Sequence, residues 1–269
     1  MNIKNLGYFF WGVISFLGMS FLCIAYATQL SPDIPGLNHS GRTLIIAHRG
    51  ASGYCLENTL VAFELAVRMG ADVIEFDLRK TRDNQLVVIH DQKIDRITKE
   101  RGEVADKTLS ELKSLPIRTY PEEKYENQRI LSLEEVLGWA RERKIRLLID
   151  VKVPGVEENL LEVIDQYQMS QRCIIACPGD NFLENVRRLN PGIMTLRQST
   201  RLGTQADILG IHYQRISSEL TRAIHEKDKL IWVWTVNTPG LIKRCLKMGV
   251  DGIITNYPDR VVEILAGEY

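Results

Sequence analysis

Short apolar runs recur along the chain from residue 44 onward, and longer polar stretches with a helical pattern separate most of them. Each run has the length and the bounding turn residues that are typical of a buried strand. The pattern predicts strands at residues 44–48, 72–77, 86–90, 146–151, 173–176, 193–196, 208–212, 231–236 and 252–255. These strands alternate with helices, and this order indicates a parallel sheet with helices outside it.

Helix starts are marked by residues that favour the N-cap position. Asn58 or Thr59 caps a helix with an apolar stripe, and Ser132 opens another helix with two glutamates in its first turn. About eight strand and helix repeats favour a closed TIM-type (β/α)8 barrel over an open doubly wound sheet. Together with the N-terminal segment described below, the fold class that we expect is α/β, a barrel preceded by one hydrophobic helix.

The alternation is interrupted at residues 92–130. This stretch holds a polar loop, a short predicted helix near residues 109–115, and a segment at 116–128 rich in Pro, Glu and Lys. We interpret it as a small insertion near the barrel mouth, within a barrel domain that spans residues 43–269. Loops of this kind often shape substrate choice.

The first 30 residues have a different character. Residues 6–27 contain no charged side chain, and as a helix they would span roughly 33 Å, enough for a bilayer core. They predict a transmembrane anchor, or a signal segment since Ala25-Tyr26-Ala27 resembles a cleavage site. Lys4 favours an inside N-terminus, so we expect a membrane-anchored domain outside the cytoplasm, or a secreted or periplasmic one after cleavage. Residues 31–42 are interpreted as a linker.

Composition excludes some functions. The 34 basic and 34 acidic residues cancel, so the chain has no electrostatic footprint for nucleic acid. The five cysteines show no metal-thiolate spacing. Cys173 and Cys177 lie in an apolar run and are expected to be ordinary core residues.

Three carboxylates are predicted at strand ends. Side chains alternate along a strand, so Glu75 and Asp77 share one face, and Asp150 shares a face with Lys152. Acids that converge inside a barrel repel one another and are costly to bury, and a divalent cation would resolve both problems. Because carboxylates are hard oxygen ligands, we expect Mg²⁺ or Ca²⁺ at Glu75, Asp77 and Asp150.

Two histidines close the predicted strands at 44–48 and 86–90. Residues 81–85 are polar, and Asp83-Asn84 suits a tight hairpin turn, which would place His90 opposite Asp77. His48 and Arg49 end the first strand. Two imidazoles can serve as general base and general acid. With a cation and the fixed charges of Arg49 and Lys152, they indicate cleavage of a phosphoester.

Each of these residues also has a plainer structural interpretation. Isolated strand-end histidines are often satisfied structural residues, so it is the coincidence of the set that favours catalysis. Asp83, Asp91 and Arg96 are interpreted as turn and loop residues, whereas His212 stays open between the two interpretations. Trp232 is expected to pack inside the barrel, and Trp234, nearer the mouth, is a candidate for contact with a glycerol or acyl group.

Between Ile45 and Arg260 the chain resembles the glycerophosphodiester phosphodiesterase family, through six separated motifs in the right order: HRGASG, ENT, GADVIEFDLRKTRD, LVVIHD, WTVN and GVDGIITNYPDR. The resemblance implies a TIM-type barrel that hydrolyses glycerophosphodiesters to an alcohol and glycerol 3-phosphate. It also implies His48 and His90 as acid and base. Its metal ligands would include Glu75 and Asp77, and its phosphate contacts would be Arg49 and Lys152.

The chain departs from the family pattern at three places. Asp150 stands where a glutamate two residues before the lysine is usual, and it is one methylene shorter. Asn256 replaces an aspartate, and Cys177-Pro178-Gly179 replaces a Ser-Phe pair. We interpret the last two changes as variation at the barrel rim.

The leading hypothesis is therefore metal-dependent hydrolysis of small glycerophosphodiesters. An alternative is lysophospholipase D-like cleavage of membrane lysophospholipids, which an N-terminal anchor would favour. A third is a barrel that binds such ligands without turnover.

Overall fold

The computed structural model of the chain describes residues 42–118, 128–177 and 179–267. The expected anchor or signal segment at residues 1–30 lies outside these ranges, as does the linker at 31–42 apart from its last residue, so both stay predictions. Among the helices that are described, none has the length and apolar character needed to cross a bilayer.

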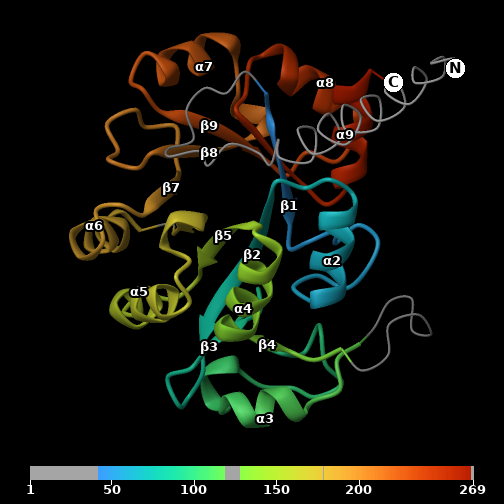
Figure 1. Cartoon of the computed structure of the whole chain (residues 1–269), viewed down its shortest axis with the longest axis vertical. Helices are drawn as coiled ribbons and strands as arrows, with labels where there is room; N and C mark the ends of the chain where they lie inside the picture. Colours follow the sequence, from blue (N-terminus) through green and yellow to red (C-terminus); the bar gives the residue numbers. More distant parts are fainter. Residues whose placement is uncertain (1–41, 119–127, 178, 268–269) are drawn as a thin grey trace, which may run out of the picture. The chain divides into compact units, whose positions relative to one another are not determined.

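Within the described ranges, eight parallel strands close into a barrel, which confirms the predicted fold (Figure 1). Their order is β1-β10-β9-β8-β7-β6-β5-β2, and a further pairing of β1 with β2 closes the ring. The strands are β1 (Leu44–His48), β2 (Val73–Lys80), β5 (Arg146–Val151), β6 (Cys173–Ala176), β7 (Met194–Gln198), β8 (Ile208–His212), β9 (Leu230–Trp234) and β10 (Gly252–Thr255).

Helices link most successive strands and lie outside the ring. They are α2 (Leu60–Arg68), α4 (Leu133–Arg143), α5 (Glu157–Gln166), α6 (Asp180–Leu189), α7 (Ser218–His225), α8 (Pro239–Lys247) and α9 (Pro258–Ala266). Thr59 caps α2, since its hydroxyl accepts a hydrogen bond from the Ala62 amide, and Ser132 forms a capping box with Glu135 at the start of α4. The loop from β7 to β8 contains no helix.

The barrel interior is filled by side chains of alternate strand residues. Trp232 is fully buried, as expected, and it lies with Ile46 against the backbone of Gly252. A methyl group built on Gly252 would come within 2.6 Å of Trp232 Cδ1 and 2.7 Å of Ile46 Cδ1. The absence of a side chain at this position therefore lets the indole fit inside the ring.

Gly252→Ala is expected to destabilise the protein by about 1–3 kcal/mol, because the new methyl group overpacks the interior. Thermal or urea unfolding measures the loss. Gly203→Ala is a matched control, since nothing lies within 4 Å of its added methyl group. Equal stability of the two variants would contradict this packing argument.

The hairpin after β2 differs from its prediction. β3 (Leu86–Val88) pairs with Leu78, Arg79 and Lys80 in the register Leu78 to Val88. The turn has three residues, 82–84, because the Thr81 amide donates to the Gln85 carbonyl and Asn84 takes a positive φ of 59°. Asp77 consequently faces Ile89, whose amide donates to the Asp77 carbonyl at 3.1 Å. The predicted pairing of Asp77 with His90 was wrong by one residue.

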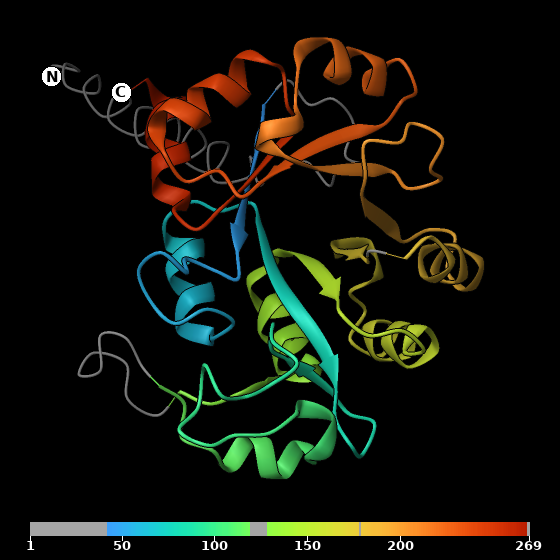
Figure 2. The ribbon, with the colours of Figure 1, turned by 180° about the vertical axis from the view of Figure 1, so that it is seen from behind.

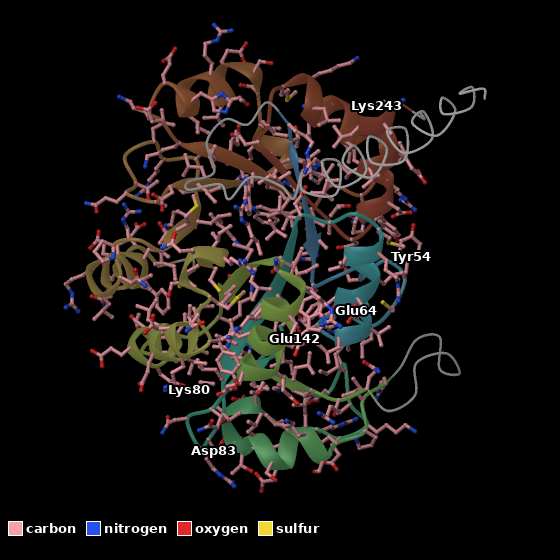
Figure 3. The ribbon with its side chains drawn as sticks, viewed as in Figure 1. Tyr54, Glu64, Lys80, Asp83, Glu142 and Lys243 are labelled. Carbon is pink, nitrogen blue, oxygen red and sulfur yellow. The ribbon has the colours of Figure 1, made fainter. Side chains whose placement is uncertain are left out.

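The described residues between β3 and β4 (Leu131–Ser132), at 89–118 and 128–130, contribute to a small apolar cluster of their own. They include the 3₁₀ helix η1 (Val104–Asp106) and α3 (Leu109–Ser114), and their apolar side chains pack with β3 in a cluster separate from the main core. Figure 2 shows α3 beyond the end of the barrel toward which the arrows of β1 and β2 point. Asp83, labelled in Figure 3, lies in the hairpin turn near α3, where it accepts a hydrogen bond from the Leu109 amide.

Candidate active site

The three predicted carboxylates come together on two neighbouring strands, Glu75 and Asp77 within β2 and Asp150 next to the last residue of β5. Asp77 of β2 is the register partner of Asp150 of β5, and Glu75 is the register partner of His48 of β1. One ligand oxygen from each of Glu75, Asp77 and Asp150 lies within 4.8 Å of the others. All three residues are buried, with exposed fractions of 4%, 1% and 7%.

Two cations lie against this acidic cluster. Lys152 Nζ is 2.5 Å from Asp150 Oδ2 and 3.0 Å from Asp77 Oδ1, and Arg49 Nε is 2.9 Å from Asp77 Oδ2. The Arg49 amide also donates to Glu75 Oε2 at 2.7 Å. Arg49 and Lys152, which we expected to contact phosphate, thus also hold the acids in place.

Burial and neighbouring charges shift the pKa values of the three carboxylic acids in different directions. Burial, with the carboxylates of Asp77 and Asp150 beside it, raises the pKa of Glu75 well above its ordinary value. Burial acts in the same direction on Asp77, but Lys152 and Arg49 outweigh it and lower the pKa of this group. Burial also raises the pKa of Asp150, although Lys152 opposes the rise. The cluster therefore favours holding a proton at Glu75 when no other cation compensates it.

A divalent cation fits this donor set. Asp150 Oδ1 is buried and accepts no hydrogen bond from any described residue, so its lone pairs are free for a ligand. Three carboxylates around one point supply the hard oxygen ligands that Mg²⁺ and Ca²⁺ prefer. Glu75, Asp77 and Asp150 are therefore the residues that could hold such an ion.

His48 is held by an amide. Its Nδ1 lies 2.7 Å from the side-chain oxygen Oδ1 of Asn256, which follows β10. The backbone N–H of Asn256 donates to Asn237 Oδ1. Since an amide oxygen accepts but cannot donate, Nδ1 carries the proton and Nε2 keeps its lone pair. Burial, together with the charge of Arg49, lowers the pKa of His48 to about 4. Asn256, which replaces the usual aspartate and which we interpreted as variation at the barrel rim, thus contacts the predicted catalytic residue His48.

His90 is held by a carboxylate instead. Its Nδ1 lies 2.6 Å from Asp91 Oδ1, and its carbonyl accepts a hydrogen bond from Arg79 Nε at 2.8 Å. His90 lines one small cavity together with Glu57 and Asn58, and Asn58 donates to Asp77. His90 therefore remains close to the acidic cluster, although the hairpin register differs from the predicted one.

Several residues of this region were not predicted from the sequence to be parts of the site. Asn58 has a positive φ of 58° and donates to Asp77 Oδ2 at 3.0 Å, whereas we considered it only as a helix cap. Glu57 accepts from Arg49. Asp91 contacts His90 and accepts from Arg96, and we had interpreted both Asp91 and Arg96 as loop residues. Glu57 and Asn58 belong to the ENT motif and Asp91 ends LVVIHD, whereas Arg96 lies outside the quoted motifs; their roles depend on contacts between distant segments.

An aromatic wall comes from β8 and β9. Trp234 is half-buried at the end of β9, and its register partner is His212 at the end of β8. The two rings meet edge to face with centroids 5.1 Å apart. Trp234 Nε1 is buried and finds no hydrogen-bond partner among the described residues. Because Trp232 faces the barrel interior, strand alternation places Trp234 on the same inner face, nearer the mouth.

Comparison with known proteins agrees with this geometry. The family model described as "Glycerophosphoryl diester phosphodiesterase family" matches residues 48–260. A glycerophosphodiester phosphodiesterase of Caldanaerobacter subterraneus is 34% identical, with 83% of this chain and 98% of that protein covered. Another from Bacillus subtilis is 31% identical over 95% of both chains.

Solved structures show the same fold. A phosphodiesterase from Oleispira antarctica, in complex with sn-glycerol-3-phosphate, has a TM-score of 0.77 at 23% identity and covers 85% of this chain and 98% of its own. A glycerophosphodiester phosphodiesterase from Thermotoga maritima has a TM-score of 0.69 at 25% identity, with 84% and 100% covered. From the family match and the curated relatives, the chain belongs to the glycerophosphoryl diester phosphodiesterase family.

Proposed function

We propose that this protein is a metal-dependent phosphoric diester hydrolase that cleaves glycerophosphodiesters to an alcohol and glycerol 3-phosphate. The observation that carries the proposal is the buried cluster of Glu75, Asp77 and Asp150, with His48 beside it and His90 close by. Family membership supports the reaction class. Two imidazoles can supply the acid and the base for phosphodiester hydrolysis, and an acidic cluster can hold a metal ion that stabilises the developing charge.

The charged residues would bind and orient the phosphate. A divalent cation held by Glu75, Asp77 and Asp150 would supply electrophilic stabilisation of the charge that develops on the phosphoryl oxygens. Arg49 and Lys152 already lie beside the carboxylates, and compensation of the acids would leave their N–H groups available for phosphate oxygens.

The two histidines have partners that suit different tasks. His48, with its proton fixed on Nδ1 by an amide oxygen, offers an unprotonated Nε2, and we assign it as the base that takes the proton from the attacking nucleophile, either water or the glycerol's own hydroxyl group. His90 donates from Nδ1 to the Asp91 carboxylate, so its Nε2 is the ring nitrogen available to the substrate. We assign His90 as the acid that protonates the leaving alcohol oxygen.

The test is release of glycerol 3-phosphate from glycerophosphocholine by the full chain, with and without chelator, and with Mg²⁺ or Ca²⁺ restored. Activity that survives complete metal removal would contradict the mechanism. Tight binding of glycerophosphocholine without any product would instead establish a binding protein. Lysophosphatidylcholine is the comparison substrate for the lysophospholipase D-like alternative, which a membrane anchor at residues 1–30 would favour.

Asp150→Glu is expected to retain at least about a tenth of the wild-type kcat, because the longer side chain keeps the same ligand atoms in a site that can adjust by one methylene. Asp150→Asn, which removes the charge at nearly unchanged volume, is expected to lower metal affinity by about 10- to 100-fold. Metal titration followed by activity separates the two variants. If Asp150→Asn bound metal as tightly as wild type, Asp150 would not be a ligand.

We also propose that the unpaired indole N–H of Trp234 donates to a hydroxyl group of the glycerol. Trp234→Phe keeps the aromatic surface and removes the donor, so KM for glycerophosphocholine is expected to rise about 5- to 20-fold. Trp139→Phe is the matched control, since Trp139 Nε1 donates to Glu64 on the helical layer. An unchanged KM in Trp234→Phe would show that this indole makes no polar contact with substrate.

A further inference from the structure

A continuous series of charged contacts connects His90 to the acidic cluster. Asp91 Oδ1 lies 2.6 Å from His90 Nδ1, and Asp91 Oδ2 accepts from Arg96 Nε at 2.6 Å. Arg96 Nη2 donates to Glu57 Oε1 at 2.6 Å, and the same oxygen lies 3.1 Å from Arg49 Nη1. Arg49 in turn contacts Asp77. The series thus reaches from the hairpin to the metal cluster through five ion pairs or hydrogen bonds.

Arg96 is the member of this series that comes from the segment 92–130. Its Nε and Nη2 bind two different carboxylates, Asp91 and Glu57, which belong to loops after β3 and β1. A guanidinium group is planar and presents these donors in a fixed fork, so it sets the position of one carboxylate relative to the other. A lysine ammonium group could not hold the same geometry.

The geometry of Asp91 depends on this fork. Its side chain is 30% exposed, so without a second partner it could turn toward water. The hydrogen bond from Arg96 is also the main cause that lowers the pKa of Asp91 to about 2, so Asp91 stays an ionised acceptor for the Nδ1 proton of His90. Because Asp91 holds Nδ1, Nε2 is the ring nitrogen of His90 that meets the substrate.

We propose that Arg96 is a positioning residue for His90, acting through Asp91, so that the loop that follows β3 contributes to catalysis. The proposal rests on the hydrolase function proposed above. It assigns to Arg96 no contact with substrate. Its effect should accordingly appear in turnover and in the state of the His90 ring, with little effect on substrate binding.

The test uses the full chain with Arg96→Gln, which keeps a polar side chain and removes the charged fork. We expect kcat for glycerophosphocholine to fall about 10- to 100-fold with KM changed less than about threefold, as is typical when the outer partner of a functional histidine is removed. Arg82→Gln is the matched control, because Arg82 is also an exposed arginine paired with a carboxylate, that of Glu111, on the outer side of the hairpin. It should keep the wild-type kcat.

Ring-nitrogen NMR of histidine-labelled protein supplies a second readout, with the His90 signals identified by their loss in His90→Ala. Wild type should carry the Nδ1 proton, and Arg96→Gln should lose this preference. A wild-type kcat in Arg96→Gln, or an unchanged His90 tautomer, would overturn the proposal. If the wild-type protein cleaved no phosphodiester, the proposed function would fail, whereas the NMR comparison would still decide whether Arg96 positions His90.

Discussion

His48→Ala and His90→Ala are each expected to lower kcat for glycerophosphocholine by about 10²- to 10⁴-fold, the usual contribution of a general acid or base. Neither side chain fills the main core, since both are partly exposed at the barrel mouth. The variants should therefore unfold within a few degrees of the wild-type protein. Steady-state kinetics and a thermal melt of each variant check both statements.

The nature of the leaving group distinguishes the two histidines. Choline is a poor leaving group and needs a proton, whereas 4-nitrophenolate leaves without one. If His90 is the acid, the loss in His90→Ala should be much smaller for bis(4-nitrophenyl) phosphate than for glycerophosphocholine. His48→Ala should lose activity toward both substrates. The reverse pattern would exchange the two assignments, and wild-type turnover in either variant would remove that histidine from the mechanism.

The barrel could be predicted from sequence because each strand and helix has a local signal. Buried strands appear as apolar runs, and Thr59 and Ser132 mark helix starts through their own hydrogen bonds with backbone amides nearby in sequence. Strand alternation also placed Glu75 and Asp77 on one face, and the expectation that the polar ends of barrel strands meet at one mouth added Asp150. Properties that depend on a few successive residues were therefore predicted well.

The hairpin register could not be predicted in the same way. Asp83-Asn84 suits a two-residue turn, yet the observed turn uses Asn84 alone in the left-handed region and includes Arg82. Asp83 is instead held by Thr81 and by the Leu109 amide of α3. The residues of the turn alone do not determine its type. The observed turn is accompanied by a contact between Asp83 and the start of α3, 26 residues away in sequence.

The contacts of the two histidines depended even more on distant residues. Asn256 meets His48 across 208 positions, and Arg96 reaches Glu57 across 39. A single sequence shows that these residues are polar and lie in loops, which is also true of most surface residues. Only closure of the ring, which brings β10 beside β1, places Asn256 at the site.

Glu75→Gln is expected to abolish metal-dependent activity while leaving the metal-free protein at least as stable as wild type. In the metal-free wild type, burial and the neighbouring carboxylates raise the pKa of Glu75 above its unfolded value. Between these two pKa values the folded state binds a proton that the unfolded state has released, so stability falls as pH rises through this window. Glutamine removes the titration, and the advantage of Glu75→Gln should therefore grow as pH rises above the ordinary pKa of a glutamate carboxyl group.

Added metal should make the wild-type protein more stable than Glu75→Gln. A divalent cation at about 100 times its Kd adds about 2.7 kcal/mol to the stability of a protein that binds it only when folded, which corresponds to about 5–10 °C in Tm for a domain of this size. Wild type should show this shift at about pH 8 and less of it at about pH 5, because the ligand must be deprotonated. Glu75→Gln should show almost no shift in Tm on addition of metal. Glu142, labelled in Figure 3, is exposed, so Glu142→Gln should behave as wild type. A full metal shift in Glu75→Gln would mean that the cation binds elsewhere, and the buried acids would then have to be stabilised by Arg49 and Lys152 alone.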